Sequence, residues 1–171
     1  MTFMFPSPLR RQLLLAAALL VLPVSAAADE TASIILFRHA IAPGVGDPPG
    51  MVIGDCATQR NLSAEGRAQA VRIGELFRGN GIAEAVVYSS QWCRCLETAT
   101  LMALGKVRPE PLLNSFAQNQ ERAAQQTAAL RPWIAALDLA RPTVMVTHQV
   151  VITALSEVFP ANGEIVVMRR E

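Results

Sequence analysis

The stretch Ile34–His39, with the sequence IILFRH, joins four apolar residues to an arginine and a histidine. A short continuous apolar run is typical of a strand buried within a parallel sheet. Such a strand delivers the residues that follow it to the carboxyl edge of the sheet, where α/β proteins bind their ligands. Here it delivers the Arg38 guanidinium beside the His39 imidazole. A cation next to a nucleophile indicates a site for phosphate.

Downstream of Asp29 the chain alternates short β-branched runs with amphipathic stretches, an order that favours a parallel sheet covered by helices. We expect strands at residues 33–37, 85–88 and 143–147, helices at about 63–79, 92–104, 120–137 and 150–159, and an added edge strand at 164–168. The predicted fold class is α/β. It is a single three-layer α/β/α domain, in which a mostly parallel sheet has helices on both faces and an antiparallel edge strand.

The first predicted helix has clear signals at both ends. Ser63 is a suitable N-cap, and Gly79–Gly81 is a suitable stop. The apolar side chains expected on its buried face are Ala70, Ile73, Leu76 and Phe77. In the third helix, Pro132 is expected to introduce a kink or to start a new turn. We assign Trp92 and Trp133 to packing.

Residues 1–28 have the composition of an export signal. Arg10 and Arg11 precede an apolar run from Leu13 to Leu22, and small residues close the segment at Ala26–Ala28. We predict cleavage there, which leaves residues 29–171 as one domain. The apolar run is shorter than the roughly 20 residues of a membrane span. We therefore expect a periplasmic or secreted protein with no stable membrane span after cleavage, exported by the general or the twin-arginine route.

Composition restricts the possible partners. The formal net charge is +1 and no basic cluster stands out, so we expect no nucleic acid partner, and any anion site is local. Three cysteines in an exported chain predict one disulfide and one free thiol. Cys93 and Cys95 face different sides of a predicted helix, so Cys56 is expected to pair with one of them. A metal site there is disfavoured, because Arg94 between the two cysteines repels a cation.

The chain has only two histidines, and each follows a predicted strand. His39 follows the first strand and His148 the third, while Ser89 and Ser90 follow the second. Arg94 comes shortly after these serines, in the first turn of a helix, where free N–H groups and the helix dipole favour an anion. We expect all of these side chains to meet at one edge of the sheet.

Three segments together resemble the signatures of the histidine phosphatase superfamily, which includes the phosphoglycerate mutases. They are Leu36–Ala40, then Ser89–Ser90 followed by Arg94 and Thr98, and Val146–His148. The stretch Asn61–Ala70 resembles the usual first helix of that family. The resemblance covers the predicted mature chain in order.

The resemblance implies that His39 is the nucleophile and forms a phosphohistidine that water later hydrolyses. It also implies that Arg38, Arg94 and His148 surround the phosphoryl oxygens and stabilise the charge of the transition state. No metal and no other cofactor is required by this chemistry. Further candidate substrate contacts are Ser89, Ser90, Gln59, Arg60 and Gln149.

One departure from the family pattern concerns protonation of the leaving group. Many members place a glutamate general acid near the position of Asn114, and an amide cannot donate a proton in that way. The candidate replacements are Asp47 and Asp55, in the Gly- and Pro-rich segment 41–60, which we expect to cover the site. Each of them also fits an ordinary turn. Otherwise the leaving group needs no proton, as in a phosphoramidate or an acyl phosphate.

The sequence therefore predicts an exported, metal-independent phosphatase that hydrolyses a phosphomonoester, either a small phosphorylated substrate or a phosphorylated envelope component. One alternative is a catalytically weak protein that binds or senses phosphate, and another is a phosphohistidine phosphatase. A metal site built from His39, His148 and a carboxylate is disfavoured by the neighbouring arginines.

Overall fold

A computed structural model describes residues 33–169, and the predicted export signal at residues 1–28 lies outside the described residues. In chain order the elements are β1 Ser33–Arg38, η1 Cys56–Thr58, α1 Ala64–Gly79, β2 Val86–Ser89, α2 Cys93–Met102, β3 Val107–Pro109, η2 Pro111–Leu113, η3 Gln120–Arg122, α3 Ala123–Ala135, β4 Thr143–Thr147, α4 Gln149–Ser156 and β5 Ile165–Arg169. Over this range, no helix has the length and apolar character needed to cross a membrane.

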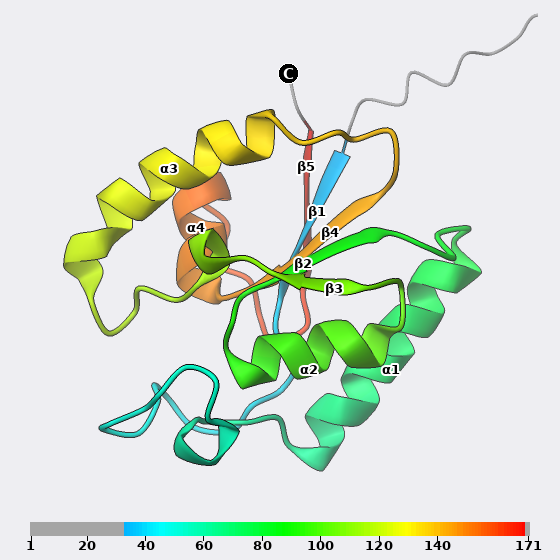
Figure 1. Cartoon of the computed structure of the whole chain (residues 1–171). Coiled ribbons are helices and arrows are strands. Elements are labelled where there is room, and N and C mark those ends of the chain that lie inside the picture. Colours follow the sequence, from blue (N-terminus) through cyan, green and yellow to red (C-terminus); the bar gives the residue numbers. More distant parts are fainter. Residues whose placement is uncertain (1–32, 170–171) are drawn as a thin grey trace, which may run out of the picture.

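The strands form one sheet in the order β3-β2-β4-β1-β5 (Figure 1). The first four strands of that order run parallel, and β5 pairs with β1 in the antiparallel direction. Strand β4 lies at the centre, and all five of its residues are buried. The predicted mostly parallel sheet with an antiparallel edge strand is therefore confirmed.

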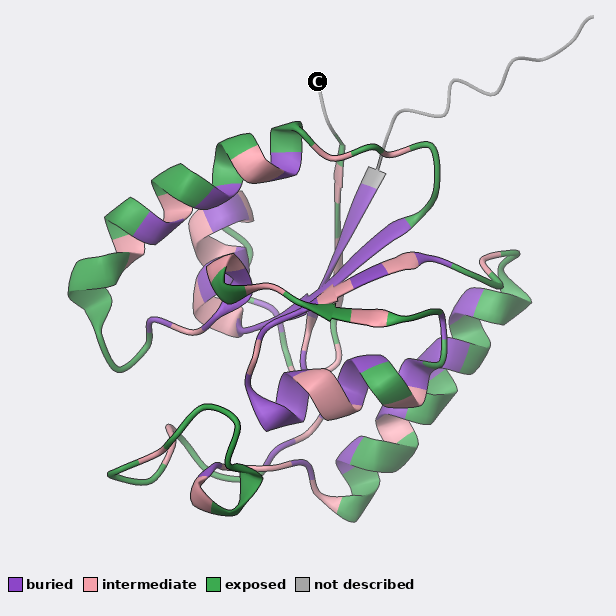
Figure 2. Ribbon diagram, in the orientation of Figure 1, coloured by how far each residue is buried: buried purple, intermediate pink, exposed green. Residues whose placement is uncertain are grey.

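Strand β1 contributes to a hydrophobic core on each face of the sheet, because successive side chains of a strand point to opposite faces. Phe37 packs with Phe77 and Met102, beneath α1 and α2. Leu36 packs with Leu130 and other apolar residues, beneath α3 and α4. Figure 2 shows β1 and β4 buried between helices whose outer faces are exposed, while the edge strands β3 and β5 are intermediate or exposed. The three-layer arrangement is as predicted.

Helix α1 begins as predicted, and the Ser63 hydroxyl accepts a hydrogen bond from the Gly66 N–H at 3.0 Å. The prediction that Leu76 is buried is wrong, since this side chain is 55% exposed. Helix α1 instead approaches α2 most closely at Gly74, where a Cβ would lie 2.0 Å from the Met102 carbonyl oxygen. Helices α1 and α2 therefore approach each other backbone to backbone at Gly74, while the other three predicted residues, Ala70, Ile73 and Phe77, are buried as expected.

Other differences concern the ends of elements. Strand β3 is not among the predicted strands, because it is only three residues long and carries no alternating apolar pattern. Helix α3 continues through Pro132 to Ala135, so no new helix starts at the proline. Helices α2 and α4 end earlier than expected, because the next residues, Ala103 and Glu157, adopt left-handed backbone conformations.

Candidate active site

The carboxyl edge of the sheet holds a cleft of about 190 Å³. Strand β1 ends in Arg38 and leads into His39, and β4 leads into His148. Helix α2 supplies Arg94 from its first turn, and the segment between β1 and α1 supplies Asp47 and Arg60. The cleft is lined by Arg38, His39, Gly44, Val45, Gly46, Asp47, Arg60, Trp92, Arg94, Ser115, Ala117, Gln118, His148, Gln149 and Val150. Residues predicted from three separate segments thus share one cavity.

The His39 ring is held in one tautomer. Its Nδ1 lies 2.8 Å from the Ala40 carbonyl oxygen, and because a carbonyl only accepts, Nδ1 carries the proton. The lone pair is then on Nε2, which accepts a hydrogen bond from Arg94 Nε at 3.2 Å. Burial, assisted by repulsion from the nearby arginines, lowers the pKa of His39 to about 3. His39 is therefore neutral near pH 7, as a nucleophile must be.

His148 lies with its ring centroid 5.5 Å from that of His39, in an edge-on arrangement. Its Nδ1 accepts from Arg94 Nη2 at 3.4 Å, so its Nε2 donates to the Ser90 hydroxyl at 2.8 Å. Ser90 in turn donates to Asn114 Oδ1 at 3.2 Å. Burial and the positive charge of the site keep the pKa of His148 well below its ordinary value. Ser90 and Asn114 thus orient the ring from behind.

Arg94 is buried and every nitrogen of its guanidinium donates to a neighbour. Besides Nε, which bonds His39, Nη1 donates to Asp47 Oδ1 at 2.7 Å and Nη2 donates to Asp47 Oδ2 at 3.0 Å. Nη1 also donates to the Arg60 carbonyl at 3.3 Å. The exposed fractions of the Arg94 and Asp47 side chains are only 3% and 5%. This buried ion pair links the cleft to the segment that covers it.

Two further guanidinium groups face the cleft. Arg38 Nη1 donates to the Pro160 carbonyl at 2.7 Å, while Arg38 Nε is buried and has no hydrogen-bond partner within the described range. Arg60 donates to the Gly46 carbonyl at 2.7 Å and to the Ala42 carbonyl. Burial and repulsion by Arg94 lower the pKa of both arginines, although they stay charged near pH 7. Three guanidiniums and one carboxylate leave a net positive cavity that suits a dianion.

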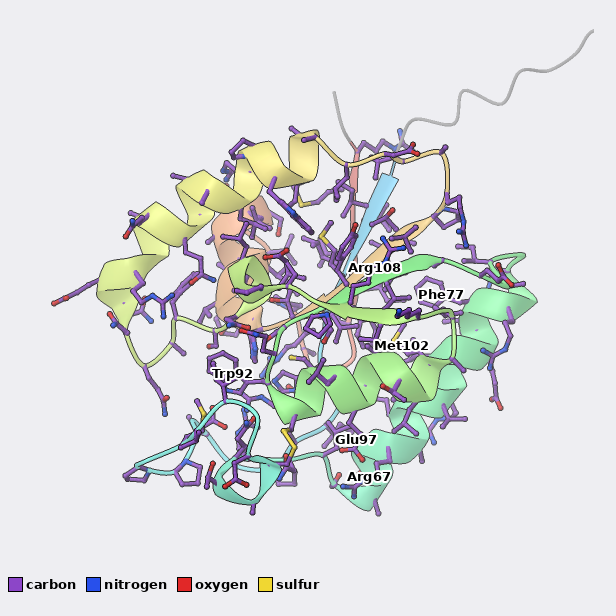
Figure 3. The ribbon with its side chains drawn as sticks, in the orientation of Figure 1. Arg67, Phe77, Trp92, Glu97, Met102 and Arg108 are labelled. Carbon is purple, nitrogen blue, oxygen red and sulfur yellow. A yellow bond between two sulfur atoms is a disulfide. The ribbon has the colours of Figure 1, made fainter. Side chains whose placement is uncertain are left out.

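A disulfide joins the segment that covers the cleft, residues 41–60, to α2. It joins Cys56 to Cys93, which resolves the alternative left open by the sequence, and Cys95 is free and buried. Figure 3 shows the sulfur–sulfur bond between the covering segment and the start of α2. Burial raises the pKa of the Cys95 thiol to about 12, so the thiol stays protonated. Across residues 33–169, no group of histidine, cysteine and acidic side chains has the arrangement of a metal site.

Several predicted contacts lie outside the cleft. Gln59 is used elsewhere: its Nε2 donates to the Val52 carbonyl and its Oε1 accepts from the Cys93 N–H, both at 2.9 Å. Ser89 donates to the Ser90 carbonyl at 2.9 Å. Asp55 caps η1 from an exposed position. These residues support the site but do not line it, whereas Arg60 and Gln149 do.

Other residues that line the cleft are not among those predicted from the sequence. Trp92 packs in the core, as predicted, and it also lines the cleft, where its Nε1 donates to Asp47 Oδ2 at 3.1 Å. Figure 3 places its side chain beside the covering segment. Ser115, Ala117 and Gln118 come from the irregular segment after η2. These three residues follow the short parallel strand β3, which also ends at this edge of the sheet. Recognition of that strand in the sequence would have placed them near the cleft. Trp133 does pack in the core, edge-on to Tyr88.

The neutral, buried histidines make the free energy of unfolding depend on pH. Between about pH 6.5 and pH 3 the unfolded chain binds a proton at His39 that the folded chain excludes, so stability falls as the pH is lowered. The lowered pKa of His148 acts in the same direction. Between pH 7 and pH 4, urea denaturation should show a loss of about 3 kcal/mol from His39. The H39Q variant should lose less, and equal losses in both proteins would refute this assignment.

Comparison with known proteins gives one match by sequence and several by fold. Residues 34–114 match the sequence model of the histidine phosphatase superfamily, branch 1. A search of curated proteins finds no match.

Solved structures similar in fold include a mycobacterial glucosyl-3-phosphoglycerate phosphatase, with a TM-score of 0.55 and 19% identity over 79% of this chain and 88% of the other. A phosphoserine phosphatase mutant from Entamoeba histolytica has a TM-score of 0.55 and 18% identity over 79% and 89% of the chains. The protein histidine phosphatase SixA, solved with tungstate, has a TM-score of 0.51 and 16% identity over 79% and 86%. At these identities the likeness concerns the fold.

Proposed function

The chain belongs to the histidine phosphatase superfamily through its residues 34–114, and on that premise we propose that it is an exported, metal-independent phosphatase. It hydrolyses a phosphomonoester through a phosphohistidine on His39. The observation that carries the proposal is the state of His39 Nε2, an unprotonated nitrogen that faces a cavity with three guanidinium groups. These cations supply the charge that a metal ion supplies in other phosphatases.

In the first step, Nε2 of His39 attacks phosphorus in line with the leaving oxygen. The N–P bond forms as the P–O bond breaks, and the leaving group departs with the electron pair. Arg38, Arg60 and Arg94 surround the three equatorial oxygens, whose charge they stabilise. The Ala40 carbonyl accepts from Nδ1–H, so it stabilises the positive charge that develops on the ring.

In the second step, water attacks the phosphorus of phosphohistidine, which releases inorganic phosphate and restores the neutral imidazole. The proton of that water passes to the phosphate that is released, while His148 stays neutral beside it. The leaving group of the first step takes its proton from solvent in this scheme. Asp55 is exposed outside the cleft, and Asp47 is committed to Arg94.

The alternative of a phosphohistidine phosphatase is favoured by one observation. Within the described range, Asp47 is the only carboxyl group that lines the cleft, and its bonds to Arg94 outweigh burial and lower its pKa. A leaving group that departs without a proton, such as the imidazole of a phosphohistidine, suits this arrangement. The same observation bears on the phosphate-binding alternative, because slow protonation would make turnover of alkyl phosphates weak.

Export is part of the proposal. Residues 1–28 have the composition of a cleaved signal, and a disulfide persists in the periplasm or outside the cell. The substrate is then a small phosphorylated molecule or a phosphorylated component of the envelope.

The proposal is tested with the protein lacking residues 1–28 and para-nitrophenyl phosphate as substrate, with and without EDTA. We expect steady release of phenolate that EDTA does not change. No release above the uncatalysed rate would favour a binding protein, and loss with EDTA would require a metal. A phosphohistidine peptide assayed in parallel tests the alternative, which predicts that the peptide has the higher kcat/KM.

A further inference from the structure

We infer that Asp47 is a positioning residue for Arg94, and that it holds the arginine so that one edge of its guanidinium faces the phosphoryl group. The inference rests on the proposed function and changes the role that the sequence suggested for Asp47, that of general acid. Asp47 lies in the covering segment, 47 residues before Arg94 in the chain. Its carboxylate thereby sets the orientation of the guanidinium edge that faces the phosphoryl group.

The contacts of Asp47 leave its carboxylate no freedom. Oδ1 accepts from Arg94 Nη1 at 2.7 Å and from the Arg60 backbone N–H at 3.1 Å. Oδ2 accepts from Arg94 Nη2 at 3.0 Å and from Trp92 Nε1 at 3.1 Å. The pair is bidentate and almost fully buried, which is the geometry that fixes a guanidinium plane most firmly.

The two ends of the Arg94 guanidinium have different partners. The Nη1–Nη2 end is occupied by Asp47, while Nε and Nη2 also reach the two histidines, His39 Nε2 at 3.2 Å and His148 Nδ1 at 3.4 Å. A phosphoryl group on His39 Nε2 must lie between these rings. Its oxygens can therefore replace the two ring nitrogens as acceptors, while the bonds to Asp47 stay intact.

The same contacts argue against Asp47 as the general acid. An acid must carry a proton, whereas both oxygens of Asp47 accept hydrogen bonds, including two from the Arg94 guanidinium. Donation to a leaving group would require the buried ion pair to break. The backbone is also fixed, because Gln118 Nε2 donates to the Asp47 carbonyl at 3.0 Å across the cleft.

The test compares D47N with wild type on an aryl phosphate and on an alkyl phosphate. Asparagine keeps the size of the side chain and removes the charge that orients Arg94. A positioning role predicts that kcat falls on the order of 100-fold for both substrates, because misplacement of a catalytic cation does not depend on the leaving group. D47E, which restores the carboxylate, should recover part of the loss. A matched control is D138N, at an exposed aspartate that accepts a hydrogen bond from the Ala140 N–H and does not line the cleft, and it should match wild type.

A general-acid role predicts a different result, because aryl groups leave without protonation. Loss confined to the alkyl phosphate, with disappearance of the alkaline limb of its pH–rate profile, would overturn the inference. An unchanged kcat for both substrates would overturn it as well.

Orthovanadate binding, measured by calorimetry, tests the inference without turnover. We expect D47N to bind vanadate on the order of 10-fold more weakly than wild type, because a freed Arg94 no longer faces the equatorial oxygens. Equal or tighter binding by D47N would overturn the positioning role and would instead mean that Asp47 competes with the ligand. If wild type binds vanadate but releases no phenolate, the proposed function fails, while the binding comparison still decides the role of Asp47.

Discussion

Replacing His39 with alanine should lower kcat/KM for para-nitrophenyl phosphate by a factor on the order of 10⁴ or more. The substitution removes Nε2, the atom that forms the bond to phosphorus in the proposed mechanism. Arg38, Arg60 and Arg94 remain, so the variant keeps the cations that attract the substrate. The effect should therefore appear in kcat, with a much smaller change in the affinity for phosphate. Steady-state kinetics on purified protein measures both quantities.

Two controls separate this loss from a folding defect. The H39A variant should keep the far-ultraviolet circular dichroism of wild type. H39Q has a polar side chain of similar length but no nucleophilic nitrogen, and it should be as inactive as H39A. Activity of either variant within a factor of ten of wild type would rule out His39 as the nucleophile.

Removal of the disulfide should lower the free energy of unfolding by about 4 kcal/mol, the chain-entropy value for a bond that joins residues 37 apart. The C56A/C93A double variant is the direct test, because alanine leaves no buried polar group at Cys93. The bond links the covering segment to the residue before Arg94, so activity should fall together with stability. Urea denaturation at neutral pH gives the free energy.

Dithiothreitol provides the matching control. Reductant should lower the stability of wild type toward that of the double variant and leave the double variant unchanged. Cys95 is buried beside His148 and stays a thiol throughout, so it does not contribute. A loss below 1 kcal/mol in the double variant would show that the covering segment is held by its other contacts alone.

The fold and the centre of the site were predictable for a physical reason. The apolar run before Arg38 and His39 has a length and composition that favour a buried strand, and it forms one. The same holds for the run before His148. Parallel strands end at one edge of the sheet. The meeting of the two histidines and Arg94 could therefore be predicted without any knowledge of side-chain contacts.

The contacts of the covering segment were not predictable in the same way. Asp47 lies in a Gly- and Pro-rich stretch, where an aspartate most often forms a turn, and no periodic pattern connects it to Arg94. Gln59 is predicted to contact substrate, yet its amide joins the Val52 carbonyl to the Cys93 N–H. Cys93 lies 34 residues further along the chain, so no local sequence pattern predicts this contact. The close approach of α1 to α2 at Gly74 was not predictable either, because it depends on the absence of a side chain there.

Trapping the covalent intermediate tests the proposed mechanism most directly. The wild-type protein is mixed with excess para-nitrophenyl phosphate, quenched in alkali within milliseconds, digested and analysed by mass spectrometry and phosphorus NMR. We expect a phosphate that is stable in alkali and lost in acid, carried by Nε2 of His39 and absent from H39Q. Phosphate on His148, on a serine or on Nδ1 of His39, or turnover with no labelled peptide, would contradict it.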